Sequence, residues 1–261
     1  MSMELGMISW ITEDCFAEAK AKGLEFIELD VNDRAEEFLE NAARLKEYVA
    51  KYDMPVLAVG RWGSSRIAKD GILQEELALE CRLIEAAAPL GCRVYITGCN
   101  YVEELSYYEN CTLAIQYFEK LIECGKKYGI KIATYNCRWN SFVCDDTAYR
   151  MIHGHLKDLY IKYDPSHGMS YGDGDYLKEM TRWAHRFAHV HLKGVVMSEN
   201  RLWDSPPAGM DMVNWPAVLA ILYTVGYEGA LSIEPHSGKW MGELGDKGLN
   251  RTIKYFRNLK L

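Results

Sequence analysis

The chain has 261 residues and a formal net charge of −7, and 49% of its residues are hydrophobic. This length suits one large α/β domain or two small ones, and the apolar fraction allows a sizeable core. The acidic balance argues against a nucleic-acid partner, which needs a basic surface. The sequence has no 18-residue apolar run and no basic-then-apolar start, so we expect a cytoplasmic protein without a membrane span or signal peptide.

The cysteines and histidines are unevenly distributed along the chain. All eight cysteines precede residue 150 and all seven histidines follow it. No C-x-x-C pair occurs, so we expect neither a zinc knot nor a disulfide framework, and most cysteines should be small buried hydrophobic residues. A site that uses histidine would belong to the C-terminal half.

The first half of the chain alternates apolar runs typical of strands with helical patterns. A strand at residues 5–10 precedes a helix at 12–22, which Thr12 caps and Gly23 ends. A strand at 26–29 precedes a helix at 34–52, whose apolar residues recur at helical spacing. A strand at 55–59, a polar loop at 61–71 and a helix at 75–90 follow. A strand at 93–97 and a helix at 112–128 complete this half.

The second half continues the same alternation. A fifth strand at 130–135 precedes a helix at 147–157, and a sixth strand at 159–162 precedes a helix at 176–186. A seventh strand at 187–192 leads into a long loop at 196–212 and a helix at 215–225. An eighth strand at 230–234 and a helix at 247–259 close the chain.

Eight strand–helix units without a linker predict parallel strands with right-handed crossovers. We therefore predict the α/β class and a (β/α)8 TIM barrel that forms a single domain over residues 1–261. The alternative is an open doubly wound sheet. Such a sheet usually has a glycine-rich phosphate loop after its first strand, and residues 9–12 do not form one.

The segment at residues 163–168 places Asp164 and His167 three residues apart, just past the sixth strand. Both side chains can point into one cavity, with Pro165 stiffening the turn and Gly168 allowing a sharp bend. A carboxylate and an imidazole together suit a divalent ion such as Zn²⁺ or Mn²⁺. The alternative is an aspartate that caps a turn beside a surface histidine.

Polar residues gather at the strand ends, where the active sites of such barrels lie. His189, His191 and Lys193 alternate along the seventh strand and should face the barrel interior. A metal shared by Asp164, His191 and Glu234 would satisfy all three buried groups, and a hydrogen-bonded polar plug is the alternative. The polar strand-end residues are Trp10, Glu28, Asp30, Arg61, Asn100, Tyr135, Asn136, Arg138, Asp164, His167, His189, His191, Lys193, Glu234 and His236.

Three segments, LYIKYDPSHG, HVHLKG and GYEGALSIEPH, resemble the sugar phosphate isomerase/epimerase family with the xylose isomerase-like barrel. The resemblance covers nearly the whole chain and is most specific from residue 129 to 236. That family holds a divalent ion with a Glu after strand five, an Asp after strand six, a His on strand seven and a Glu on strand eight. The last three correspond to Asp164, His191 and Glu234, and His167 resembles the family histidine that contacts substrate oxygens.

The first family ligand has no counterpart, because Tyr135 stands at the expected glutamate position. A neutral phenol is a poor ligand for Mg²⁺ or Mn²⁺, although Asn136 can offer an oxygen. Gly194 likewise stands where the family has an aspartate. We therefore expect a divalent cation (Mn, Mg, Zn or Co) that is weakly held.

The resemblance implies proton transfer next to a sugar carbonyl through an ene-diolate. Glu234 is the expected base, which removes the proton, and it is also an expected metal ligand. Tyr135 or a relayed water would carry out the other proton-transfer step, in which the proton returns to carbon. The expected partner is a small sugar or polyol, with no nucleic acid and no membrane, and the chain is a candidate homo-oligomer. The residues expected to bind substrate are His167, Lys193, Arg138, Asn136, Glu28 and Trp10.

Three other functions share this barrel. An apurinic-site endonuclease needs a three-zinc cluster with histidines from early strands, and residues 1–152 contain no histidine. An inosose-type dehydratase uses a similar metal site to remove a hydroxyl from a cyclic polyol. A catalytically idle sugar-binding barrel is the third alternative, because Tyr135 replaces a catalytic glutamate.

Overall fold

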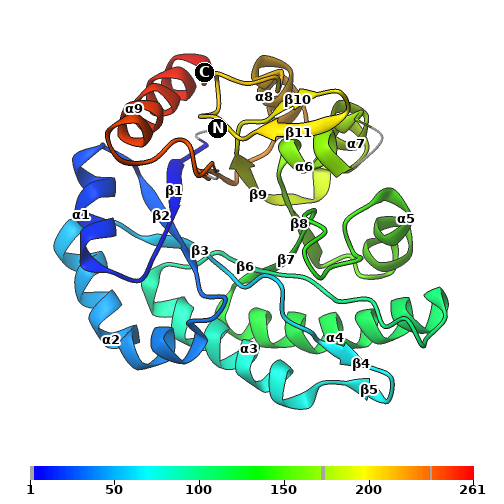
Figure 1. The fold of residues 1–261 in the computed structure, drawn as a ribbon. Coiled ribbons are helices and arrows are strands. Elements are labelled where there is room, and N and C mark those ends of the chain that lie inside the picture. The colour runs from blue at the N-terminus through cyan, green and yellow to red at the C-terminus, as the bar shows by residue number, and fades with distance from the viewer. Residues whose placement is uncertain (1–2, 172–173, 236) are drawn as a thin grey trace.

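The computed structural model describes residues 3–171, 174–235 and 237–261, which form a closed eight-stranded barrel surrounded by helices (Figure 1). Adjacent strands pair in parallel, and β1 pairs with both β2 and β12 to close the barrel. The predicted (β/α)8 barrel is therefore confirmed, and the open sheet is excluded. The barrel strands are β1 (Leu5–Ser9), β2 (Phe26–Asp30), β3 (Val56–Gly60), β6 (Val94–Thr97), β7 (Lys131–Tyr135), β8 (Leu159–Tyr163), β9 (Phe187–Leu192) and β12 (Ala230–Ile233).

The helices lie around the outside of the barrel (Figure 1). Helix α4 begins several residues before the predicted start, because Ser106 and Glu109 form a capping box at its N-terminus. No helix in the described part of the chain is long and apolar enough to cross a membrane. The main helices are α1 (Glu13–Ala21), α2 (Ala35–Tyr52), α3 (Gln74–Ala87), α4 (Tyr107–Tyr128), α7 (Tyr176–Trp183), α8 (Trp215–Thr224) and α9 (Gly242–Leu259), and the shorter ones are η1 (Ala88–Leu90), α5 (Asp146–Ala148), η2 (Tyr149–His153) and η3 (Ala184–Arg186).

Two of the predicted loops contain short antiparallel hairpins. The loop after β3 holds β4 (Ile67–Ala68) and β5 (Gly71–Ile72), and the loop after β9 holds β10 (Val196–Ser198) and β11 (Arg201–Asp204). These strands have only two to four residues. Segments this short carry too little side-chain alternation to be recognised from the sequence.

The predicted turn after β8 is instead a short helix, α6 (Pro165–Tyr171). Asp164 Oδ1 accepts a hydrogen bond from the Ser166 amide at 2.8 Å, as a helix N-cap does, and Pro165 fits the first helical position. Gly168 lies inside this helix and does not bend the backbone. A Cβ there would lie 2.7 Å from Tyr176 Cβ, so close packing requires the glycine.

Strand alternation separates two apolar clusters. Outward residues such as Ile27 and Leu29 belong to the large core between the barrel and its helices. Inward residues such as Ala58, Ile96 and Ala133 form a smaller cluster inside the barrel. The three alanines of this cluster, Ala58, Ala133 and Ala188, leave space in the barrel interior for polar groups.

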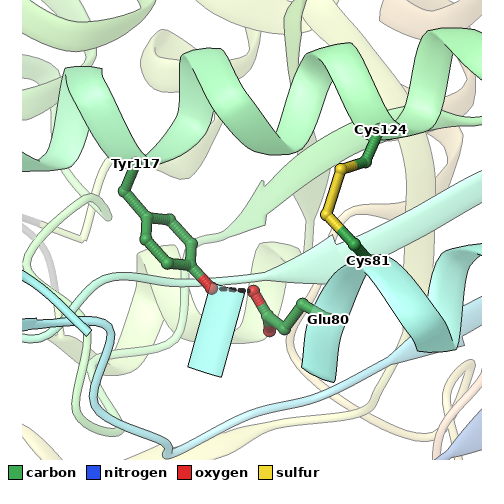
Figure 2. Close-up of a disulfide and its surroundings, with 4 residues drawn as sticks. All are labelled: Glu80, Cys81, Tyr117 and Cys124. Atoms are coloured by element: carbon green, nitrogen blue, oxygen red, sulfur yellow. Dashed lines mark hydrogen bonds between the residues drawn. A yellow bond between two sulfur atoms is a disulfide. The ribbon is translucent and has the colours of Figure 1, made fainter. Parts of the chain in front are cut away.

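A buried ion pair anchors the loop that follows β3. Arg66 Nη2 lies 2.9 Å from Glu80 Oε1, and both side chains are fully buried. Thr97 and Tyr117 also donate to the Glu80 carboxylate, and Figure 2 shows the Tyr117 contact. A buried pair persists only when hydrogen bonds satisfy its remaining atoms, and here the neighbours supply them.

A disulfide joins Cys81 of α3, the residue after Glu80, to Cys124 of α4 (Figure 2). The expectation that the chain forms no disulfide framework missed this pair, because a sequence separation of 43 gives no local signal. The other six cysteines are free, and three of them, Cys92, Cys99 and Cys111, are buried as expected.

We predict that the Cys81→Ala/Cys124→Ala double variant loses stability relative to the oxidised protein. Closing a loop of this length restricts the unfolded chain by about 4 kcal/mol in the loop-entropy model. Urea unfolding with and without dithiothreitol measures the effect. The double variant should unfold at the same urea concentration under both conditions, and a wild-type midpoint insensitive to reductant would contradict the prediction.

Candidate functional site

A cavity of about 710 Å³ opens at the C-terminal ends of the barrel strands. Its walls include the aromatic side chains of Trp10, Trp62, Trp139 and Tyr171. Its polar lining comes from residues at the ends of β8, β9 and β12, among them Lys162, His167, Lys193 and Glu234. Apolar walls with a few convergent polar groups are typical of a small-molecule site.

The two carboxylate oxygens of Asp164 have different contacts. Oδ1 caps helix α6 through the Ser166 amide, whereas Oδ2 is buried and has no hydrogen-bond partner among the described residues. Oδ2 lies 3.4 Å from His167 Nε2 and 3.6 Å from Lys193 Nζ. Burial raises the pKa of Asp164, but His167 and Lys193 outweigh it, so the net pKa is lowered and the carboxylate is ionised.

Asn136 fixes the position of Asp164. Its side-chain Nδ2 donates to the Asp164 carbonyl and its Oδ1 accepts from the Asp164 amide, both at 2.9 Å. Neither atom of this amide group therefore faces the cavity, and Asn136 does not line it. The expectation that Asn136 offers an oxygen to a metal or substrate gives way to a positioning role.

His191 lies between two carboxylates. Its Nε2 is 2.8 Å from Glu28 Oε2, and its Nδ1 contacts Glu234 Oε2. Burial alone would lower the pKa of His191, but Glu28 and Glu234 outweigh it and raise the pKa. His189 Nε2 also lies 2.8 Å from Glu28 Oε2, so Glu28 joins two histidines beneath the cavity. This part of the site is the hydrogen-bonded polar plug expected as an alternative.

Glu234 lies at the junction of the plug and the cavity. Lys193 Nζ is 3.4 Å from Glu234 Oε1, on the side of the carboxylate opposite to His191. Burial opposes ionisation of Glu234, but Lys193 and His191 hold its pKa well below the usual value. Glu234 is therefore a carboxylate at neutral pH, which is the state that a general base requires.

Lys193 and His167 complete the polar group around Asp164. Lys193 Nζ lies 3.3 Å from His167 Nε2. Burial lowers the pKa of His167 to about 3, so its ring is neutral and offers one donor and one acceptor. Burial disfavours the Lys193 ammonium, but Glu234 and Asp164 outweigh it and raise the pKa of Lys193 above its ordinary value.

Asp164, His191 and Glu234 fit a divalent metal ion. Each offers one ligand atom, and these atoms lie within 4.8 Å of one another. The buried Asp164 Oδ2, which makes no hydrogen bond within the described part of the chain, is the kind of atom that a cation satisfies. Two carboxylates and one imidazole form a donor set that Zn²⁺ and Mn²⁺ accept.

Tyr135 has a different environment from the one expected of a catalytic residue. Its hydroxyl donates to the Trp139 carbonyl at 3.0 Å and accepts from the Gly63 amide at 3.2 Å. The side chain is fully buried, does not line the cavity, and burial raises its pKa to about 12. Tyr135 therefore joins the loops after β3 and β7.

Three other residues that were predicted to bind substrate lie in different places relative to the cavity. Trp10 lines it, is half exposed, and has the Arg34 guanidinium 4.8 Å above its ring. Arg138 is exposed and lines a neighbouring hollow of about 480 Å³ instead. Glu28 is buried in the plug below the cavity, and His236 lies outside the described residues.

The sequence analysis missed Lys162, whose side chain lines the cavity. Lys162 lies on β8, two residues before Asp164, so strand alternation places both side chains on the inner face. The sequence therefore contained a signal that could have identified Lys162. Gly194, which departs from the family pattern, also has a structural reason. A Cβ at this position would lie 2.0 Å from the Pro206 carbonyl oxygen.

We predict that Asn136→Ala lowers the affinity for Mn²⁺ by about 10-fold or more relative to the wild type, because Asp164 loses the side chain that orients it. The variant should also lose about 1–3 kcal/mol of unfolding free energy, since two buried backbone groups lose their partner. Calorimetric titration with Mn²⁺ and urea unfolding measure the two effects.

Asn110 supplies a matched control, because its side chain clamps the amide and carbonyl of Val102 at 2.8 and 3.0 Å. This clamp lies at the start of α4. Asn110→Ala should lose comparable stability and keep wild-type Mn²⁺ affinity. Equal loss of Mn²⁺ affinity in both variants would show that Asn136 acts only through stability.

Solved structures with sugar-related names share this fold. The apo 3-keto-D-glucoside 4-epimerase YcjR from E. coli has a TM-score of 0.76 and 16% identity, covering 98% of this chain and 100% of that chain. A D-allulose 3-epimerase from Methylomonas sp. in complex with D-allulose has a TM-score of 0.78 and 15% identity, covering 99% and 97%. The IOLI protein with a bound zinc atom has a TM-score of 0.76 and 17% identity, covering 98% of each chain.

No curated protein matches the chain at a significant level. The sequence does match a family model described as a xylose isomerase-like TIM barrel, over residues 16–259. This match covers almost the whole chain and agrees with the closed parallel barrel of the structure. The chain therefore belongs to the xylose isomerase-like TIM barrel family.

Proposed function

We propose that this protein is a sugar isomerase or epimerase that moves a proton at the carbon next to a carbonyl group. The observation that carries the proposal is the convergence of ligand atoms from Asp164, His191 and Glu234 within 4.8 Å of one another, with Glu234 lining the cavity. The three solved structures named above are two sugar epimerases and a zinc-containing protein, which agrees with this choice.

The cavity suits a polyhydroxylated ligand. Ser9 and Ser166 line it, and the hydroxyl oxygen of each is buried without a hydrogen-bond partner from residues 3–171, 174–235 or 237–261. A sugar hydroxyl that enters the cavity can satisfy such an atom, which removes the cost of leaving it unpaired. The indole rings of Trp10 and Trp139 supply flat apolar faces at the cavity wall.

Glu234 is the proposed base. Its carboxylate is ionised and lines the cavity, so it can accept the proton of a substrate carbon that lies next to the carbonyl. The electron pair of that C–H bond forms a C=C bond, and the carbonyl oxygen becomes negatively charged. The proton then returns to the same carbon or to its neighbour, which gives an epimer or an isomer.

Asp164, His191 and Glu234 are the proposed metal ligands, and a divalent ion bound there would polarise substrate oxygens and lower the energy of the ene-diolate. His167 and Lys193 line the same cavity and hold substrate oxygens by hydrogen bonds. The Tyr135 hydroxyl is occupied by two backbone groups, so this proposal gives it no proton-transfer role.

A sugar-binding barrel without turnover is the second candidate function. It is favoured by one observation, the tyrosine at position 135, where the family that the sequence resembles has a glutamate. Calorimetry against a panel of ketoses, together with product analysis, separates the two functions. Binding without proton exchange would favour the second.

We predict that Glu234→Gln slows exchange of a ketose C–H proton with solvent deuterium by about 10²–10⁴-fold, because glutamine cannot accept the proton. Proton NMR of ketoses incubated in D₂O measures the exchange. Metal content is measured on the same samples, so that loss of the base is separated from loss of a bound ion.

Glu228→Gln is the matched control, since Glu228 is an exposed glutamate just before β12, at the opposite end of the barrel from the cavity. It should exchange protons at the wild-type rate. Unchanged exchange in Glu234→Gln at equal metal content would reject Glu234 as the base.

A further inference from the structure

Lys162 is a buried cation that faces the cavity. Its side chain is only 1% exposed, yet it lines the cavity wall. Strand pairing places it opposite Tyr135 on one side and His189 on the other. The ring of Trp62 lies 5.9 Å from its Nζ, at the outer limit of a cation–π contact.

No carboxylate oxygen of the described residues lies within 4.0 Å of Lys162 Nζ, and no hydrogen bond to this atom is formed within the same residues. The other buried cations differ in this respect. Arg66 pairs with Glu80 at 2.9 Å, and Lys193 lies 3.4 Å from Glu234. A buried charge without a close partner destabilises the folded protein, so a partner supplied by a ligand would offset this cost.

The nearby carboxylates already have other partners. Glu28 accepts from His189 and His191, and Glu234 contacts His191 and Lys193. Lys162 acts on Glu234 and on Asp164 only through space, lowering the pKa of both carboxyl groups. Its ammonium therefore remains available to a negatively charged oxygen that enters the cavity.

We propose that the Lys162 ammonium binds the substrate oxygen on which negative charge develops during proton transfer, which makes Lys162 a catalytic residue. This inference rests on the proposed isomerase or epimerase function. When Glu234 removes the proton, the C–H electron pair forms the C=C bond and the carbonyl π pair moves to oxygen. The resulting oxyanion lies beside Lys162, and it re-forms the carbonyl when the proton returns to carbon.

A fixed ammonium in a water-poor cavity stabilises such an oxyanion more strongly than it stabilises the neutral carbonyl. Lys162 should therefore affect turnover more than it affects binding of neutral ligands. A residue with only a structural role would instead change the binding of charged and neutral ligands alike.

The test uses the full-length variants Lys162→Met and Lys162→Arg, with Lys131→Met as the matched control. Lys131 is an exposed lysine at the start of β7, and its Nζ lies 4.9 Å from the Tyr160 ring. The first probe is oxalate, a planar dianion that mimics the two oxygens of an ene-diolate, and the second is the neutral polyol xylitol. Calorimetry gives both dissociation constants, with and without added Mn²⁺.

Lys162→Met should weaken oxalate binding at least 10-fold and change xylitol binding less than 2-fold. Lys162→Arg should retain part of the oxalate affinity, and Lys131→Met should match the wild type. Equal changes for both probes, or a wild-type protein that does not bind oxalate, would overturn the proposal.

Turnover provides an independent readout on any ketose that exchanges protons. Lys162→Met should lower kcat at least 10²-fold and change KM less than 3-fold, and a reduced affinity with unchanged kcat would contradict a catalytic role. If the wild type exchanges no proton with any ketose, the proposed function fails. The oxalate and xylitol comparison still decides whether Lys162 is an oxyanion-binding residue.

Discussion

Mutual neutralisation of buried charges is the constraint on which this site depends. The inner face of the barrel carries Glu28, Asp164 and Glu234, and carboxylates in such an environment are costly unless cations and hydrogen bonds surround them. The two ring nitrogens of His191 contact Glu28 and Glu234. The Lys193 ammonium contacts the other carboxylate oxygen of Glu234. Each side chain is held where its neighbours need it, so the groups that face the cavity are positioned before a ligand arrives.

The barrel was predictable because its signals are local and repeated. Every predicted barrel strand lies within about one residue of the observed one, since strand alternation and helix caps recur in each unit. Alternation also placed His191 on the inner face, and the family resemblance pointed to Asp164 and Glu234, whose ligand atoms lie within 4.8 Å of that of His191. The two short hairpins and helix α6 escaped prediction, because a few residues carry little periodicity.

Long-range partners were the part of the site that the sequence could not provide. Nothing near Asn136 indicates that its amide bonds the backbone of Asp164, 28 residues later. Tyr135 was assigned by its place in a family pattern, whereas its hydroxyl contacts the Gly63 amide, 72 residues earlier. The Cys81–Cys124 disulfide is a third case, with a sequence separation of 43. Lys162 is different, since the alternation that marked Asp164 also marks it.

The two oxygens of Asp164 couple the cavity to helix α6. Oδ1 holds the first turn of the helix through Ser166, while Oδ2 faces the groups around the cavity. A ligand that binds Oδ2 therefore contacts the same carboxylate group whose Oδ1 caps the helix. Helix α6 also carries His167 and Tyr171, which line the cavity. We therefore expect occupancy of the site to change the mobility of α6, which hydrogen exchange of its amides measures.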